Sequence, residues 1–174
     1  MTCRVSNFLI NQICEKAIAG ITRGERDALS AIYDSIGRQV YYLAYSMLQN
    51  HHDAEDVLQQ TLIELVRCAH TYQKGAGARA WILGIARNQS RKLARDRREV
   101  PSEEIDTGHH PFETNLTMEE ALATLGEEER RIVILRVFSD MKYKEIAAEL
   151  QITTAAAEKK YQRAIQKLKQ YYTG

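Results

Sequence analysis

The chain has 174 residues, a hydrophobic content of 44% and a formal net charge of only +1. This length leaves room for one ordinary domain or two small ones, and the apolar content is enough for a packed interior. The near-neutral charge excludes a protein that is basic throughout, so a surface that binds a polyanion must arise from segregation of charge along the chain.

No stretch of the sequence predicts a membrane span or a signal peptide. No apolar run approaches the roughly 20 residues that cross a bilayer, and asparagine and glutamine residues before position 13 interrupt any apolar core of a leader. The cysteines are few and widely spaced: Cys3, Cys14 and Cys68. They form no CxxC pair and no disulfide framework, so we expect a cytosolic protein in a reducing compartment.

The first hundred residues follow the helical period. A first helix is predicted around residues 10–21 and a long second helix over 29–47, where apolar residues recur at steps of three and four. Asp53 is predicted to be the N-cap of a third helix, with Asp56 in its first turn. The residues expected inside on this helix are Val57, Leu58, Thr61, Leu62, Leu65 and Val66. After the break KGAGARA, a fourth helix is predicted over about 79–98.

A linker is predicted between two helical halves. Both prolines, Pro101 and Pro111, fall within an acidic segment that carries Gly108 and has no apolar period. Such composition is typical of an extended, flexible connection. The sequence therefore predicts three parts: a domain over 1–98, a linker over 99–116 and a second domain over 117–174.

The C-terminal half predicts a helix-turn-helix. The run TMEE, Thr117–Glu120, is expected to be a capping box that opens a helix, which Gly126 can end. Two later helices, over 143–150 and from 154 onward, are separated by the short turn QIT, which is helix-turn-helix spacing. The cations of the last helix are Lys159, Lys160, Arg163, Lys167 and Lys169. No strand pattern competes, so we predict an all-α fold with two small helical domains.

The end of the fourth helix is strongly basic. Residues 87–101 carry six arginines and lysines against two carboxylates. A helix dipole is complemented by one or two cations, whereas six can neutralise several phosphates and release their counterions. With the basic last helix they form two polyanion-binding surfaces on one tether, which favours nucleic acid over a merely solvated face. The residues expected to act through phosphates are Arg91, Lys92, Arg95, Arg97 and Arg98.

Three segments in this order resemble the extracytoplasmic-function (ECF) sigma factors of bacterial RNA polymerase, in the sigma-70 family. They are DAEDVLQQTL (53–62), AWILGIARN (80–88) with its basic tail, and LGEEERRIVILRVFSDMKYKEIAAEL (125–150). The resemblance implies a sigma-2-like domain that binds core polymerase and melts the minus-ten element, and a sigma-4-like domain that recognises the minus-thirty-five element. It implies as partners the clamp helices of the largest polymerase subunit, the flap of the second-largest subunit, promoter DNA and an anti-sigma factor, commonly a membrane protein. It implies no cofactor, no metal and no enzymatic activity.

The resemblance also implies roles for individual residues. Core-polymerase binding falls to Asp53, Glu55, Asp56, Gln59 and Gln60 on the polar side of the third helix. Minus-ten recognition falls to Tyr72, Lys74, Arg79, Asn88, Arg91, Lys92 and Arg95. In this group Tyr72 is expected to stack on an unpaired base, while Lys74 and Arg79 hold phosphate. Minus-thirty-five recognition falls to Thr153, Thr154, Ala155, Glu158, Lys159, Lys160 and Arg163.

The recognition helix departs from the family's pattern at its start. Gln151 occupies a turn that usually has a glycine with positive φ, at a cost of about 1 kcal/mol. Lys142 replaces the usual serine cap of the preceding helix, whereas Thr153 keeps the N-cap role. Glu158 repels phosphate near the first turn, although its carboxylate can accept from cytosine N4.

Alternatives for the same residues stay open. His51, His52, Asp53 and Glu55 offer metal ligands, although adjacent histidines point in different directions and carboxylates at a helix start are ordinary caps. The polar side of the third helix also fits a merely solvated face. The alternative function is a stand-alone helix-turn-helix regulator, but no ligand or phosphoacceptor module is visible. An enzyme is disfavoured because no nucleophile–base pair, P-loop or HExxH motif occurs. A purely protein-binding helical adaptor is disfavoured because it would not need the residues expected to contact bases and phosphates.

Overall fold

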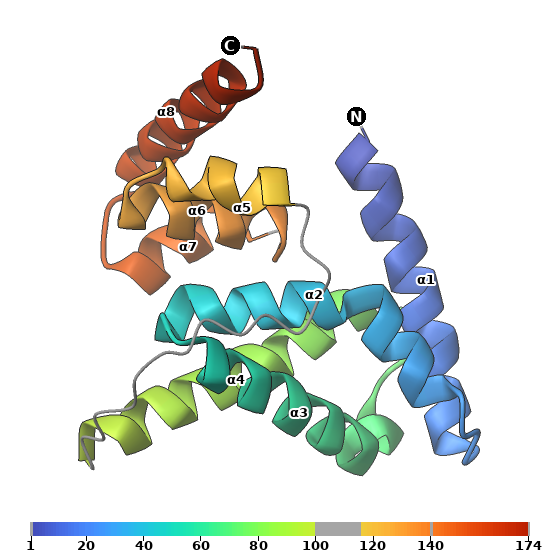
Figure 1. Cartoon of the computed structure of the whole chain (residues 1–174). Coiled ribbons are helices and arrows are strands. Elements are labelled where there is room, and N and C mark those ends of the chain that lie inside the picture. Colours follow the sequence, from blue (N-terminus) through green and yellow to red (C-terminus); the bar gives the residue numbers. More distant parts are fainter. Residues whose placement is uncertain (1, 100–115, 140, 174) are drawn as a thin grey trace. The chain divides into compact units, whose positions relative to one another are not determined.

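The computed structural model describes residues 2–99, 116–139 and 141–173 (Figure 1). The chain divides into two compact units, residues 1–109 and 110–174. All regular structure in the described residues is helical, with no strand among them. The predicted all-α class with two helical domains is thus confirmed. None of the described helices is long and apolar enough to cross a membrane.

The first unit is a bundle of four helices. Its helices are α1 (Thr2–Thr22), α2 (Ala28–Leu48), α3 (His51–Cys68) and α4 (Ala78–Glu99), with a short 3₁₀ turn, η1 (Ala69–Thr71), after α3. The long helix α2 packs against the other three, and α3 and α1 also contact α4. The fully buried side chains include Ile32, Ile36, Val40 and Leu43 of α2, Leu65 of α3, and Ile82 and Leu83 of α4. This interior fixes the angles at which α3 and α4 present their outer faces.

The start of α3 differs from the prediction. Asn50, not Asp53, is the N-cap: its backbone is extended and its Oδ1 accepts from the backbone N–H of Asp53 at 3.0 Å. Asp53 therefore lies inside the first turn, with 3% of its surface exposed. Val66 also differs, because 49% of its surface is exposed rather than buried. Both errors concern which side of the helix faces the bundle.

The second unit consists of α5 (Leu116–Ala123), α6 (Glu127–Val137), α7 (Tyr143–Leu150) and α8 (Thr154–Thr173). Leu122, Leu125, Val133 and Ala164 form its hydrophobic cluster. Gly126 does not end the first of these helices as predicted. α5 stops at Ala123, and Gly126 is instead the N-cap of α6. The side chain of Thr117 and the interior of the predicted linker lie outside the described residues.

The turn between α7 and α8 follows the predicted chemistry. Gln151 closes α7 in the left-handed region with φ 55°, and its N–H donates to the carbonyl of Ala147. Thr153 is the side-chain cap of α8, because its Oγ1 accepts from the N–H of Ala156 at 3.1 Å. At the start of α7, the Lys142 side chain makes no cap. Its backbone N–H donates to Glu145 at 2.7 Å instead.

Candidate nucleic-acid interface

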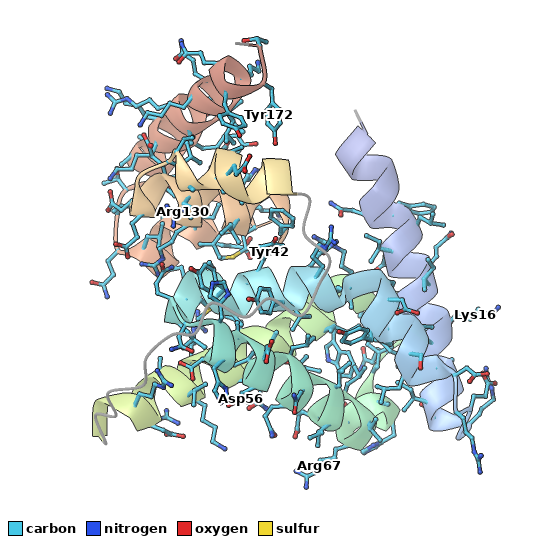
Figure 2. The ribbon with its side chains drawn as sticks, viewed as in Figure 1. Lys16, Tyr42, Asp56, Arg67, Arg130 and Tyr172 are labelled. Carbon is cyan, nitrogen blue, oxygen red and sulfur yellow. The ribbon has the colours of Figure 1, made fainter. Side chains whose placement is uncertain are left out.

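One exposed stripe runs along α3. Asp56, Gln59 and Gln60 are exposed, and Ile63 and Val66 follow on the same face at steps of three and four. Figure 2 shows Asp56 and Arg67, near the two ends of this stripe, on the side of α3 that faces away from α2. We call Asp56, Gln59, Gln60, Ile63 and Val66 the α3 stripe. The sequence analysis missed both apolar members of the stripe: it assigned Val66 to the interior and did not consider Ile63.

Asp53 and Arg97 pair with each other. Arg97 Nη2 lies 2.7 Å from Asp53 Oδ1, and the two side chains are 29% and 4% exposed. The predicted polymerase-binding Asp53 and the predicted phosphate-binding Arg97 are therefore joined in an ion pair between α3 and α4. Glu55, the remaining predicted residue of this group, is half-buried.

A basic face runs along α4. Asn88, Arg91, Lys92 and Arg95 are all exposed and lie at steps of three and four, which places them on one side of the helix. A groove of about 350 Å³ separates this face from the α3 stripe. Its lining includes Asp56 and Gln60 from α3, and Gln89, Lys92 and Asp96 from α4. The two predicted surfaces therefore adjoin along a shared groove.

The loop before α4 is held by α1. Tyr72 Oη donates to Glu15 Oε1 at 2.6 Å, and the N–H of Gly75 donates to the same oxygen at 2.9 Å. The ring of Tyr72 lies 5.0 Å from that of Trp81. Partial burial and the bond to Glu15 raise the pKa of Tyr72 to about 12. The same bond, with that from Gly75, lowers the pKa of Glu15.

Arg79 lies inside the bundle rather than on its surface. Only 6% of its surface is exposed. Its Nε donates to Gln39 Oε1 at 2.9 Å, and its backbone N–H donates to Asn11 Oδ1 at 3.0 Å. The guanidinium therefore connects the start of α4 to α2, whereas Lys74 of the same loop is exposed.

The cations of α8 divide between two faces. Lys160 pairs with Glu128, and Lys167 donates to Glu129 at 2.7 Å, so both tie α8 to α6. The hydrogen bond from Lys167 lowers the pKa of Glu129. A neighbouring face borders a groove of about 400 Å³ lined by Lys159, Gln162, Arg163, Ile165, Gln166 and Lys169. Arg163 lies between the two faces, since its charge also helps to lower the pKa of Glu129. The predicted Thr154, Ala155, Glu158, Lys159 and Arg163 are all exposed. Gln162 and Gln166 were missed, although their spacing from Lys159 marks the same face. Lys169 was counted among the cations of this helix but not among the residues assigned to the minus-thirty-five element.

The residues of the metal alternative are engaged separately. His51 Nδ1 bonds with the Tyr41 hydroxyl, and His52 Nδ1 lies 3.4 Å from Asp56 Oδ2. Within the described part of the chain, no three or more His, Cys, Asp and Glu side chains gather as metal ligands would.

The fold and these surfaces define a helical helix-turn-helix protein with a basic face in each of its two units. Residues 32–100 match the family model Sigma-70 region 2, and residues 116–168 match the model Sigma-70, region 4. The chain belongs to the ECF sigma factors of the sigma-70 family, the transcription initiation factors of bacterial RNA polymerase.

Proteins with similar sequences are ECF RNA polymerase sigma factors as well. The chain is 30% identical to the ECF RNA polymerase sigma factor SigE of Mycolicibacterium smegmatis, over 85% of this chain and 64% of that one. It is 22% identical to the ECF RNA polymerase sigma factor SigW of Bacillus subtilis, over 92% of this chain and 97% of that one. The chain thus spans just under two thirds of the first relative and nearly all of the second. Among solved structures, the sigma factor RpoE bound to the anti-sigma factor NepR from Bartonella quintana has the same fold, with a TM-score of 0.52. That match has 23% identity and covers 84% of this chain and 98% of that one.

Proposed function

We propose that this chain binds core RNA polymerase through the α3 stripe and promoter DNA through the basic faces of α4 and α8. The observation that carries the proposal is the groove between α3 and α4. Asp56 and Gln60 of the α3 stripe line one side of it, and Lys92 of the basic α4 face lines the other, beside Gln89 and Asp96. Exposed apolar side chains beside polar ones are typical of protein interfaces, and an exposed basic helix face is typical of contact with phosphates.

The minus-ten strand is assigned to the first unit. The loop 72–79, which we count to include the first two residues of α4, would receive an unpaired base. Tyr72 would supply an aromatic ring and Lys74 a cation, while the α4 face holds the backbone of the strand. Arg79 is assigned a positioning role here, because its guanidinium is buried against Gln39.

The minus-thirty-five duplex is assigned to α8. Its first turn, with Thr154, Ala155 and Glu158, would meet base edges, and the groove-lining Lys159 and Arg163 would meet phosphates. Lys160 is assigned to holding α8 on α6 through Glu128.

An anti-sigma protein is proposed as regulator. The support is that two solved structures of this fold are sigma factors in complex with such partners: RpoE with NepR, and CnrH with the cytosolic domain of CnrY. The inhibitor would cover the α3 stripe and the α4 face, so adding it to the chain should prevent binding of both core polymerase and DNA.

The place of action is proposed to be the cytoplasm, where polymerase and chromosome meet. Cys14 and Cys68 are free thiols, which suits a reducing compartment. The chain would supply binding surfaces, and the polymerase would carry out the chemistry.

The direct test is reconstitution with core polymerase from the organism that encodes the chain. We expect the chain to co-purify with core and to select promoter fragments from a genomic library, yielding permanganate-reactive unpaired thymines. Specific binding of duplex DNA by the chain alone, without any effect of core polymerase, would instead support a stand-alone regulator.

A further inference from the structure

Helix α1 contacts the loop 72–79 at both of its ends. Glu15 Oε1 accepts from the hydroxyl of Tyr72 and from the N–H of Gly75, and Asn11 Oδ1 accepts from the N–H of Arg79. Asn11 and Glu15 are four residues apart, so they lie on one face of α1. These bonds join residues far apart in the sequence, 57 positions in the case of Tyr72 and Glu15. The match to the region 2 model begins at residue 32, so Asn11 and Glu15 lie before the matched segment.

The loop needs such support because its two glycines allow the backbone many conformations. Gly75 and Gly77 have φ of 85° and 89°, which glycine adopts readily but at a high entropic cost when fixed. Its own backbone hydrogen bonds are few: the N–H of Tyr72 donates to Ala69, that of Ala76 to Gln73, and that of Trp81, in α4, to Gly77. A binding loop that is already ordered binds more tightly than one that must be ordered by its ligand.

The charge of Glu15 opposes the approach of DNA at this place, although neighbouring cations stabilise the carboxylate itself. A cavity of about 620 Å³ lies between α1 and the loop, and its lining includes the cations Lys16, Arg23 and Lys74. Figure 2 shows Lys16 pointing outward from α1. Glu15 is the one carboxylate among the described residues that line the cavity. A carboxylate here repels a DNA strand, yet it accepts two hydrogen bonds from the loop, and Lys74 also favours its charge.

We propose that Glu15 and Asn11 are positioning residues that hold the loop 72–79 ready for an unpaired promoter base, which makes α1 part of the DNA-melting surface. The inference rests on the proposed function of the loop. A positioning role predicts the opposite effect from that of a carboxylate that only repels DNA. Removing a merely repelling carboxylate strengthens DNA binding, whereas removing a positioning carboxylate weakens base capture.

The experiment compares three holoenzymes on a promoter fragment that the wild-type holoenzyme has selected. Glu15→Ala removes the acceptor, Glu15→Gln keeps an acceptor oxygen without the charge, and Asp34→Ala removes an exposed carboxylate from α2 as the matched control. We expect Glu15→Ala to lower the yield of permanganate-reactive open complex about tenfold, the size of losing hydrogen bonds to a charged group. Glu15→Gln should stay within about threefold of wild type and Asp34→Ala at or slightly above it, since a retained acceptor and a distant charge cost little.

Two further measurements separate positioning from misfolding. Trp81 is the chain's single tryptophan and lies beside Tyr72, so its emission reports the loop in the free protein. Glu15→Ala should change this emission while binding core polymerase as wild type does. Tyr72→Phe removes only the hydroxyl, and its loss should not add to that of Glu15→Ala, because both remove the same bond.

The outcomes distinguish this inference from the proposed function. If the wild-type chain binds no core polymerase and opens no promoter, the proposed function fails. If wild type opens promoters and both Glu15 variants open them equally well or better, Glu15 is only a charge and the inference is overturned. Should Glu15→Ala fail to fold, an unchanged yield of open complex in both Tyr72→Phe and Asn11→Ala would overturn it too.

Discussion

Arg97 and Asp53 form an ion pair 2.7 Å long that joins the end of α4 to the first turn of α3. Asp53 is nearly fully buried, so its charge depends on this partner. The pair fixes the end of the basic α4 face beside the start of the α3 stripe. It also sets Arg97 apart from Arg91, Lys92 and Arg95, the cations that we propose contact DNA.

Substitution of Arg97 and of Arg95 should therefore have different consequences. Arg97→Ala should destabilise the first unit by about 1–3 kcal/mol, less than for a fully buried pair because Arg97 is 29% exposed. Arg95→Ala should leave stability unchanged and lower the salt slope of promoter binding by about one unit. Urea unfolding and binding titrations at several salt concentrations measure the two effects. Equal salt slopes and equal stabilities for the two variants would contradict this division.

Charge reversal at Asp56 should abolish capture of core polymerase. Asp56 is exposed on the α3 stripe, and its contact with His52 is also exposed, so Asp56→Lys should keep helicity and cost little stability. The change reverses the charge at the proposed interface. A pull-down of core polymerase measures the effect, and Asp34→Lys on α2 is the matched control. Wild-type capture by Asp56→Lys would show that the α3 stripe is a solvated face.

The apolar end of the α3 stripe should contribute to the same contact. Ile63 and Val66 are 48% and 49% exposed, so changing each to serine removes little from the hydrophobic interior. Each change should weaken binding of core polymerase by about 1–2 kcal/mol, the scale of burying such a side chain at an interface. Titration of labelled core polymerase gives the affinities. Unchanged affinity for the double variant would confine the interface to the polar half of the stripe.

The first turn of α8 should control which upstream sequence is preferred. Glu158 is exposed close to the Thr153 cap, so Glu158→Lys should redistribute about 1–3 kcal/mol among upstream variants. Lys160→Ala should change stability more than preference, since Lys160 pairs with Glu128. Open-complex yields on a panel of upstream sequences measure both. If Glu158→Lys strengthens every promoter equally, Glu158 is an electrostatic brake and not a base contact.

The contact between Tyr72 and Glu15 should persist into alkaline solution. The pKa of Tyr72 is raised to about 12, so the folded protein holds this proton more tightly than the unfolded chain does. The stability that the contact contributes is therefore present below pH 10 and is lost as pH rises toward 12. Trp81 emission between these values measures the loss, because a phenolate beside the indole quenches it. In Glu15→Ala the change should begin at lower pH, and an unchanged midpoint would mean that Glu15 does not hold the phenol.

The sequence by itself determined helices such as α2 and, in the second unit, the turn between α7 and α8. Apolar steps of three and four predicted α2, and the cap at Thr153 and the positive φ at Gln151 were predicted correctly. These features depend on residues within four positions of one another. Spacing specifies the helix, and the resemblance to the family's turn implies the cap and the positive φ. The basic end of α4 was likewise predicted, from its run of arginines and lysines.

Only the tertiary structure decided which charged side chains remain at the surface. Asp53 and Arg79 lie in polar segments of the sequence. Packing against α4 buries Asp53, and packing against α2 buries Arg79. The partner of each comes from another helix, Arg97 for Asp53 and Gln39 for Arg79. No local pattern carries that information, because the pairing follows from how helices distant in sequence cross. For the same reason, the bond between Glu15 and Tyr72 has no signature in the sequence.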